Sequence, residues 1–243
     1  MVSYATAVMD PEKTMANVLI TGTNRGIGLA LTRLYAEAGD TVFAFCRTPQ
    51  SADRLNELAR HSGGGVRVHA MDVGDETSIK TAAGAVGNLP VDILINNAGV
   101  RGGTSQSLEH TNTADWIEAF KVMTIGPFRV VQAFLPNLKA AKDPKIISIS
   151  TQIAATTWPT GGFYSYASTK AALNRVMLSM ARDLKGQVIV AMIHPGWVKT
   201  DLGGPGADIT PEESARGVRN VIASLTKADS GKFYKWNGDI HPW

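Results

Sequence analysis

The sequence predicts an α/β fold in which a parallel β-sheet is covered by helices on both faces. Short apolar runs rich in β-branched residues alternate along the chain with longer helical stretches, a rhythm typical of parallel sheets. The run at 17–21 passes directly into a glycine turn and then into a helix, as in nucleotide-binding α/β domains. The 243 residues contain no internal repeat and no low-complexity linker, so we expect one folded domain.

Seven strands and six helices are expected in alternation. We expect the strands, where apolar and β-branched residues cluster, at 17–21, 41–46, 66–71, 93–96, 145–150, 188–193 and 232–234. We expect the helices at 26–38, 51–60, 75–87, 113–140, 165–185 and 211–226. Three helices begin beside a capping residue, namely Asp75, Thr113 and Thr210, and a proline follows the last of these at the first helical position.

Composition and charge exclude several classes of protein. Apolar residues make up 44% of the chain and charged residues 19%, which suits a globular protein. No apolar run approaches the roughly 18–20 residues that span a bilayer, so we expect no membrane segment. A net charge of +3 with scattered basic residues disfavours nucleic-acid binding. The five histidines are far apart and form no metal-ligand spacing, so we expect no metal.

The N-terminal region and the single cysteine bear on location. Residues 1–14 lack the charged start and apolar stretch of a signal peptide, and we expect a flexible extension there. Cys46 has no second cysteine to pair with, which suits a reducing compartment. We therefore expect a cytoplasmic protein with its folded domain at 15–243.

The glycine turn carries the first chemical signal. Gly22, Gly26 and Gly28 follow a G-x-x-x-G-x-G spacing, which differs from the G-x-G-x-x-G of ordinary dinucleotide folds. Glycines let the backbone turn tightly and approach a pyrophosphate, whose charge is stabilised at the N-terminus of the following helix. Alone, this spacing is only modest evidence for a nucleotide site.

Three further motifs follow the glycines: Asn-Asn-Ala-Gly at 96–99, Tyr166-x-x-x-Lys170 and Pro195-Gly196. Together the four motifs resemble the short-chain dehydrogenase/reductase family along nearly the whole chain. The segment 194–201 (HPGWVKTD) is most similar to short, single-domain members that include C-factor-like carbonyl reductases. The resemblance implies a Rossmann fold with a seven-stranded parallel sheet and an NADP-binding domain.

The resemblance places the choice between NAD and NADP at the end of the second strand. NAD-preferring members usually carry an Asp there, whereas this chain has Cys46 followed by Arg47. Arg25, directly before Gly26, adds a second cation within the glycine turn. Guanidinium groups suit a 2′-phosphate that carries nearly two negative charges. Either arginine alone is often a solvated surface charge, but the pair without the acid predicts NADP(H) as the cofactor.

The family motifs imply the remaining contacts of the cofactor. Residues after the third strand would hold the adenine, those of the Asn-Asn-Ala-Gly motif would border the ribose, and those from Pro195 onward would line the nicotinamide end. The full expected set is Gly22, Asn24, Arg25, Gly26, Ile27, Gly28, Arg47, Asp72, Val73, Asn97, Ala98, Gly99, Tyr166, Lys170, Pro195, Gly196, Val198 and Thr200.

Tyr166 and Lys170 are the expected catalytic pair. Residues at i and i+4 share one face of a helix, here the one expected at 165–185. A carbonyl that receives hydride needs a proton on its oxygen, and a tyrosine hydroxyl can supply it. The free phenol has a pKa of about 10, and we expect the nearby ammonium to lower it.

The resemblance implies two more catalytic positions, and this chain departs from the family at both. Many relatives have Ser-Ser at the end of the fifth strand, where this chain has Ser150-Thr151. The second residue usually binds the substrate carbonyl, so Thr151 is expected in that role and Ser150 is the alternative. Met123 occupies the position of the usual Asn in the long middle helix, and a thioether is only a weak acceptor. We expect Met123 to slow proton supply, with Thr124 as a partial replacement.

These features predict an NADPH-dependent reductase that converts a ketone or aldehyde to an alcohol. The alternative is an NADP-binding signalling or regulatory protein with little turnover, which Met123 and Thr151 would favour. A homodimer or homotetramer is expected to form through the helices at 113–140 and 165–185. Their apolar residues, some of which must face the sheet, are Phe120, Phe128, Phe134, Leu173, Met177 and Met180.

Overall fold

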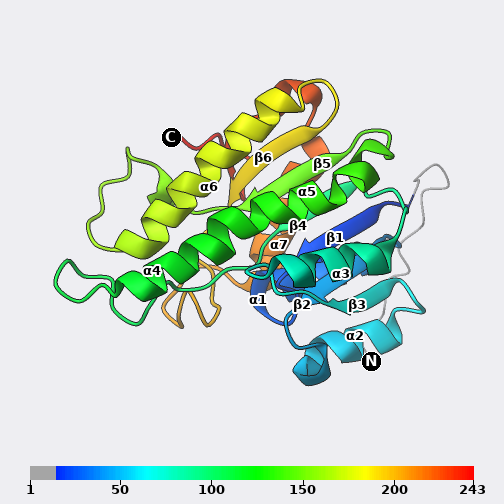
Figure 1. The fold of residues 1–243 in the computed structure, drawn as a ribbon, viewed down its shortest axis with the longest axis horizontal. Coiled ribbons are helices and arrows are strands. Elements are labelled where there is room, and N and C mark those ends of the chain that lie inside the picture. The colour runs from blue at the N-terminus through cyan, green and yellow to red at the C-terminus, as the bar shows by residue number, and fades with distance from the viewer. Residues whose placement is uncertain (1–14) are drawn as a thin grey trace, which may run out of the picture.

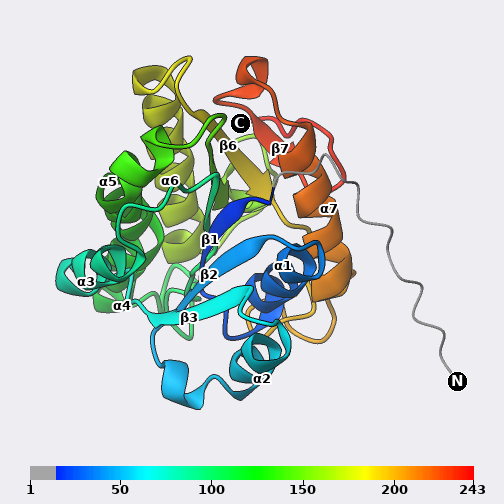
Figure 2. The ribbon, with the colours of Figure 1, turned by 90° about the vertical axis from the view of Figure 1, so that its right-hand side faces the viewer.

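The computed structural model describes residues 15–243, which form one seven-stranded parallel sheet with helices on both faces (Figures 1 and 2). The extension expected at 1–14 lies outside the described residues. The sheet order is β3-β2-β1-β4-β5-β6-β7, and every neighbouring pair is parallel. The strands are β1 (Asn17–Thr21), β2 (Thr41–Cys46), β3 (Val66–Ala70), β4 (Ile93–Asn96), β5 (Lys145–Ile149), β6 (Ile189–His194) and β7 (Phe233–Lys235).

The helices divide between the two faces as Figure 2 shows. One face carries α1 (Gly26–Glu37), α2 (Asp53–His61) and α7 (Pro211–Ser224), and the other carries α3 (Glu76–Val86), α4 (Thr113–Phe120), α5 (Gly126–Lys139) and α6 (Tyr164–Asp183). None of the helices within residues 15–243 combines the length and apolarity needed to cross a membrane.

The predicted fold class is confirmed, and the expected strands and helices are all present. Their ends differ from the prediction by one or two residues, as helix and strand ends commonly do. The helix expected at 113–140 is the one larger difference, because a π-helical turn at Lys121–Ile125 separates α4 from α5. Pro127 has no N–H to offer the carbonyl of Met123, and the amide of Gly126 instead bonds the carbonyl of Lys121, five residues back.

Two apolar clusters hold the layers together, one on each side of the sheet. Alternate residues of β5 serve opposite sides: Ile146 belongs to the cluster under α3, α5 and α6, and Ile147 to the cluster under α1 and α7. The structure also shows which apolar residues of the helices expected at 113–140 and 165–185 face solvent and which face the sheet. Only one of them is strongly exposed, Phe128 at 40%, and four are buried against the sheet, namely Phe134, Leu173, Met177 and Met180.

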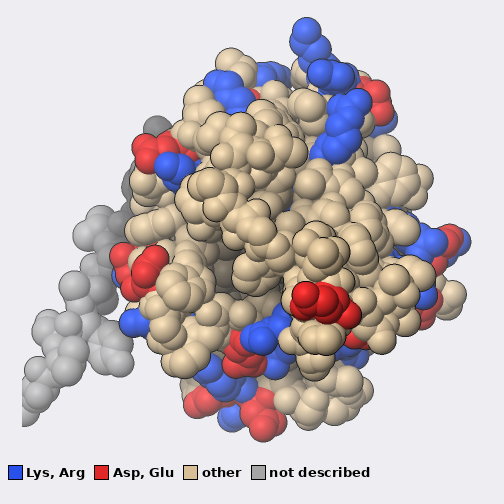
Figure 3. Space-filling view, turned by 90° about the vertical axis from the view of Figure 1, so that its left-hand side faces the viewer, with Lys and Arg blue, Asp and Glu red and all other residues tan. Residues whose placement is uncertain are grey.

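The order of the strands positions the functional site. From β1 the chain moves outward through β2 to β3, and it then returns to place β4 on the other side of β1. The position between β1 and β4, where the order of the strands reverses, is the switch point of the sheet. The crossovers leave a crevice there, beyond the carboxyl ends of the strands. The loops after β1 and β4 therefore meet there. Figure 3 faces this end of the sheet, and uncharged side chains cover most of its upper and central surface.

We predict contrasting effects for two phenylalanines of α5. Phe134→Ala removes a fully buried ring and should lower the free energy of unfolding by about 3–5 kcal/mol. Phe128→Ala should change it by less than about 1 kcal/mol, because this ring is 40% exposed. Urea unfolding followed by circular dichroism measures both. Equal losses for the two variants would contradict the layer assignment.

Candidate active site

The glycine loop, residues 22–28, packs too closely on the loop after β4 to accept side chains. Gly22 has a left-handed backbone (φ +73°), and a Cβ there would lie 2.8 Å from the Cα of Ala98. A Cβ on Gly28 would overlap the carbonyl oxygen of Gly22 and the amide nitrogen of Asn97. The motif glycines therefore create the close approach between β1 and β4.

Asn97 fixes this approach with hydrogen bonds. Its Nδ2 donates to the carbonyl oxygens of Thr21 (2.9 Å) and Gly22 (3.1 Å). In return, the hydroxyl of Thr21 accepts from the backbone amides of Asn97 and Ala98, each at 3.1 Å. The Asn-Asn-Ala-Gly motif thus holds the glycine loop in place.

The N-terminus of α1 is open to an anion. Arg25 occupies the N-cap position with an extended backbone, and its side chain makes no capping hydrogen bond. The first amides of a helix lack partners within the helix, and the helix dipole adds positive potential at this end. Asn24 and Arg25 are exposed beside it. A phosphate group fits this position by charge and by hydrogen bonding.

Two further predicted residues follow the strands β2 and β3. Arg47 is exposed at the end of β2. Asp72 follows β3, and its carboxylate accepts from the amide of Gly74 at 2.8 Å, which shapes the turn that contains Val73. Arg25 reaches across the site and forms an ion pair with Asp201 at 2.7 Å.

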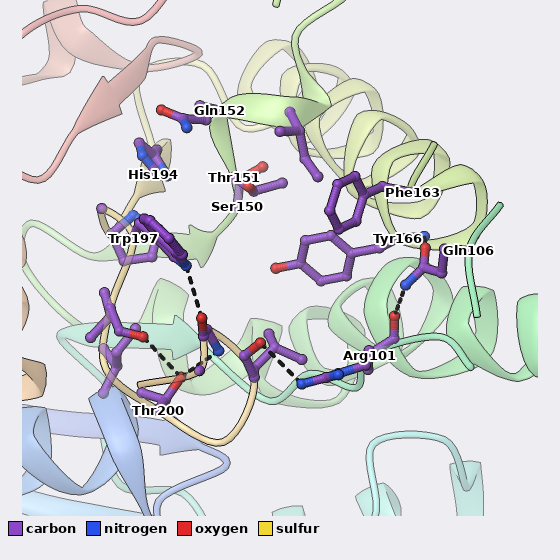
Figure 4. Close-up of a pocket in the computed structure, with 18 of the residues that line it drawn as sticks. Arg101, Gln106, Ser150, Thr151, Gln152, Phe163, Tyr166, His194, Trp197 and Thr200 are labelled. Carbon is purple, nitrogen blue, oxygen red and sulfur yellow. Dashed lines mark hydrogen bonds between the residues drawn. The ribbon is translucent and has the colours of Figure 1, made fainter. Parts of the chain in front are cut away.

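A cavity of about 560 Å³ opens beside the glycine loop (Figure 4). It brings together eight of the predicted site residues: Ile27, Ser150, Thr151, Tyr166, Pro195, Gly196, Val198 and Thr200. Lys170 lies behind this lining, buried to 4% exposure. The other predicted residues do not line this cavity. The described residues contain no group of three or more His, Cys, Asp or Glu placed to hold a metal ion.

Tyr166 and Lys170 share a face of α6, but burial governs their ionisation. Burial raises the pKa of the Tyr166 hydroxyl to about 12 and lowers the pKa of the Lys170 ammonium to about 8. The pKa of Tyr166 is therefore raised and not lowered as expected, because in this geometry desolvation exceeds any stabilisation of the phenolate by Lys170. The ammonium is itself desolvated, and its Nζ donates to the carbonyl oxygen of Ile149 at 2.7 Å.

The two candidates for binding the substrate carbonyl differ in their partners. The hydroxyl of Ser150 is buried and donates to Oδ1 of Asn174 on α6 at 2.6 Å. Thr151 lines the cavity, and its hydroxyl forms no hydrogen bond within residues 15–243. Thr151 is thus the residue whose hydroxyl is available to a ligand, whereas Ser150 anchors the end of β5 to α6.

Met123 lies in the π-helical turn and is completely buried in the apolar cluster. Thr124, expected as a partial replacement for the missing Asn, donates its hydroxyl hydrogen bond to the carbonyl of Thr169 at 2.8 Å. Thr124 therefore ties the turn to α6. A slower proton supply through Met123 stays a prediction.

Two loops border the cavity, one at 101–112 after β4 and one at 197–209 after β6. The 197–209 loop is closed at its base by a bridge between Val198 and Ile209, and its tip carries the ion pair of Asp201. Arg101, in the loop after β4, donates to the carbonyls of Asp201 (3.0 Å) and Leu202 (3.4 Å). The two loops and the glycine loop are thus joined across the cavity.

The comparison with known families decides the assignment. The sequence model of the short chain dehydrogenase family matches residues 16–208. The chain belongs to the short-chain dehydrogenase family. Within it, the chain is similar to the C-signal of Myxococcus xanthus, with 38% identity over 156 residues that cover 63% of this chain and 93% of the relative.

Solved structures of family members share the fold. The NADPH-bound carbonyl reductase from chicken fatty liver superposes with a TM-score of 0.88 at 34% identity, covering 94% of this chain and 99% of the reductase. A carbonyl reductase from Pseudomonas aeruginosa PAO1 in complex with NADP gives a TM-score of 0.86 at 28% identity, covering 95% of this chain and all of the reductase. Both comparisons agree with the predicted family resemblance.

Sequence reasoning missed several residues of the site. Gln106 accepts from the backbone amide of Tyr166 and from the hydroxyl of Ser165, each at 3.0 Å, and so fixes the start of α6. Asn174 holds Ser150, and its spacing of four residues after Lys170 could have indicated a shared helix face. Gln152 and His194 also line the cavity. The position of His194 directly before Pro195-Gly196 could have indicated that it lines the same site.

We predict that Lys170→Met stabilises the protein at neutral pH. The folded state disfavours the Lys170 ammonium, whose pKa is about 8 against an ordinary 10.5, so the full cost applies below pH 8 and vanishes as the pH rises toward 10.5. The gain at pH 7 should be at most about 3 kcal/mol, less the value of the lost hydrogen bond to Ile149. Thermal unfolding at pH 7 and pH 10 measures it.

Lys185→Met is the matched control, because Lys185 is exposed just after α6 and should affect stability little at either pH. A Lys170→Met protein no more stable than wild type at pH 7, or a gain that does not shrink by pH 10, would contradict the desolvation argument.

Proposed function

We propose that this short-chain dehydrogenase reduces a ketone or aldehyde to an alcohol with NADPH. The observation that carries the proposal is the meeting, in one cavity, of the Tyr166 hydroxyl and the free Thr151 hydroxyl beside a glycine loop open to phosphate. Lys170 lies one turn along α6 from Tyr166. The NADPH of the chicken carbonyl reductase and the NADP of the Pseudomonas enzyme support the choice of cofactor.

The residues around the crevice fit a phosphorylated dinucleotide. The amides at the start of α1 would bind the pyrophosphate. A side chain at Gly28 would overlap Gly22, so glycine is needed there for the tight turn that leads into these amides. Arg47, which has no ion pair within the described residues, would bind the 2′-phosphate together with Arg25. Asp72 and the segment from Pro195 to Thr200 would border the two ends of the cofactor.

The chemistry of the chain itself concerns the carbonyl oxygen. A nicotinamide held at this site would supply the hydride for the carbonyl carbon. Tyr166, whose pKa lies near 12, keeps its proton at neutral pH and donates it to the oxygen as negative charge develops there. Thr151 donates a hydrogen bond to the same oxygen. Lys170, charged below its pKa of about 8, stabilises the phenolate left on Tyr166.

Three further expectations belong to this proposal. A homodimer or homotetramer would use the exposed apolar residues of α4, the π turn and α5, which are Ile117, Ile125 and Phe128. Cytoplasmic action is expected because Cys46 is a buried, unpaired thiol. The similarity to C-signal and the buried Met123 favour the second candidate, an NADP-binding signalling protein with little turnover.

The proposed function predicts turnover with NADPH. The purified protein should consume NADPH with activated ketones, aldehydes or quinones, and more slowly with NADH. Tyr166→Phe should lower the rate by roughly 100-fold or more, because it removes the proton donor. Tyr164→Phe is the control, since this partly exposed tyrosine does not line the cavity and should leave the rate unchanged. Tight NADPH binding without turnover would instead favour the signalling candidate.

A further prediction concerns the ion pair between Arg25 and Asp201. If Arg25 binds the 2′-phosphate, the carboxylate of Asp201 competes for it. Asp201→Asn should then tighten NADPH binding by about 2–5-fold, as an exposed pair contributes up to about 1 kcal/mol. NADH binding should not change, because NADH lacks the 2′-phosphate. Nucleotide fluorescence titrations at low salt measure both affinities.

Asp208→Asn provides the control on the same loop, because Asp208 is exposed and forms no ion pair within the described residues. An equal gain for NADPH and NADH, or no gain for either, would remove Arg25 from the 2′-phosphate site.

A further inference from the structure

Gln152 and His194 line the cavity and have no role in the proton transfer described above. They come from neighbouring strands, since Gln152 follows β5 and His194 ends β6. The register of these strands pairs Ile149 with Ile193, which brings the two residues to the same edge of the sheet. In Figure 4 both lie on the left of the cavity, with Phe163 and Tyr166 on the right and Thr151 between them.

Both side chains lack hydrogen-bond partners. His194 is only 7% exposed, and neither of its ring nitrogens has a hydrogen-bond partner in the described part of the chain. Nδ1 is fully enclosed by protein, so Nε2 is the nitrogen that a ligand in the cavity would meet. The Gln152 amide likewise makes no hydrogen bond with residues 15–243. A polar group in a cavity wall that has no protein partner is free to bind a ligand, and the half-buried Gln152 amide and Nε2 of the buried His194 are two such groups.

The imidazole of His194 is held in a fixed orientation. Its ring meets the ring of His241 edge-on, with centroids 6.0 Å apart, and His241 in turn lies 4.7 Å from the ring of Phe233. His241 and Phe233 are themselves buried. The C-terminal segment therefore closes one side of His194 and leaves the cavity as the open side.

The charge of this wall restricts the ligand. Burial, followed by the effects of His241 and Lys235, lowers the pKa of His194 to about 4, so the imidazole is neutral at physiological pH. Its Nε2 then offers the cavity a donor or an acceptor, according to the tautomer, and the Gln152 amide offers both kinds. Arg101 is the charged residue among the described lining residues, and its guanidinium already donates to loop carbonyls. An uncharged oxygen matches this wall better than a carboxylate does.

We propose that Gln152 and His194 form a second substrate subsite, which binds an uncharged oxygen located beyond the reacting carbonyl. This inference rests on the proposed reductase function. The substrate class is an aromatic ketone with a second carbonyl or a hydroxyl group. Its apolar body would lie against Phe163 and Trp197, both of which line the cavity and are about half exposed.

Paired substrates test the subsite through kcat/KM. Propiophenone and 1-phenyl-1,2-propanedione differ in the second carbonyl. For each enzyme variant, the ratio of the two kcat/KM values cancels losses that are common to both substrates. Gln152→Leu and His194→Leu should each lower kcat/KM for the dione by about 10-fold, chiefly through KM, and change propiophenone by less than about 2-fold. His194→Asn keeps a donor and an acceptor and should recover part of the loss.

Leu202→Ala is the matched control, because this apolar residue lines the same cavity and should affect both substrates alike. Circular dichroism and NADPH fluorescence titration check that each variant keeps its fold and binds nucleotide. If the leucine variants leave the substrate ratio unchanged, the subsite is wrong although the reductase function stands.

A binding measurement decides the subsite even if the wild type reduces neither ketone. In the presence of NADP, 1-hydroxy-1-phenyl-2-propanone should raise the unfolding temperature more than 1-phenyl-1-propanol does, and His194→Leu should abolish that difference. If neither ketone is reduced but the two alcohols still differ in their effect on the unfolding temperature, the reductase function is wrong and the subsite stands. Equal shifts from the two alcohols in the wild type would overturn the subsite.

Discussion

The close contact between the ends of β1 and β4 is the constraint on which the rest of the site depends. Asn97 can reach the carbonyls of Thr21 and Gly22 only because no side chain stands at Gly22 or Gly28. The same contact sets the start of α1, where the amides are open to an anion. The hydrogen bonds of Asn97 thus join β1 to β4 and also fix the helix start that is open to an anion. This explains why the glycine motif and the Asn-Asn-Ala-Gly motif occur together.

Helix α6 transmits this organisation to Tyr166 and Lys170, the proposed catalytic pair. Its start is fixed by Gln106, its middle by the hydroxyl of Thr124, and its face toward β5 by the Ser150–Asn174 hydrogen bond. Each anchor comes from a different segment of the chain, so Tyr166 is located by several independent contacts. A proton donor held on a rigid helix needs little reorganisation when the carbonyl oxygen becomes charged.

The sequence predicted what depends on local pattern and failed where distant contacts decide. Runs of β-branched residues were sufficient for the sheet, and i, i+4 spacing for the shared helix face of Tyr166 and Lys170. The catalytic role of the pair came from the family resemblance and stays a prediction. The π turn depends on a proline inside an otherwise helical pattern, which normally indicates a kink rather than a widened turn. Neither the direction of the Tyr166 pKa shift nor the Arg25–Asp201 pair was predictable, because burial and ion pairing arise only after folding.

The departures from ordinary folding rules gather at the carboxyl end of the sheet. Phe163 has a left-handed backbone (φ +53°), Lys170 is a buried cation, and Asn174 and His194 keep buried nitrogens without partners in the described chain. The apolar clusters farther along the strands supply the stability that offsets these costs. Natural sequences tolerate such conflicts mainly where function requires them. This argument supports including the polar wall beyond Thr151 in the proposed active site, together with Tyr166.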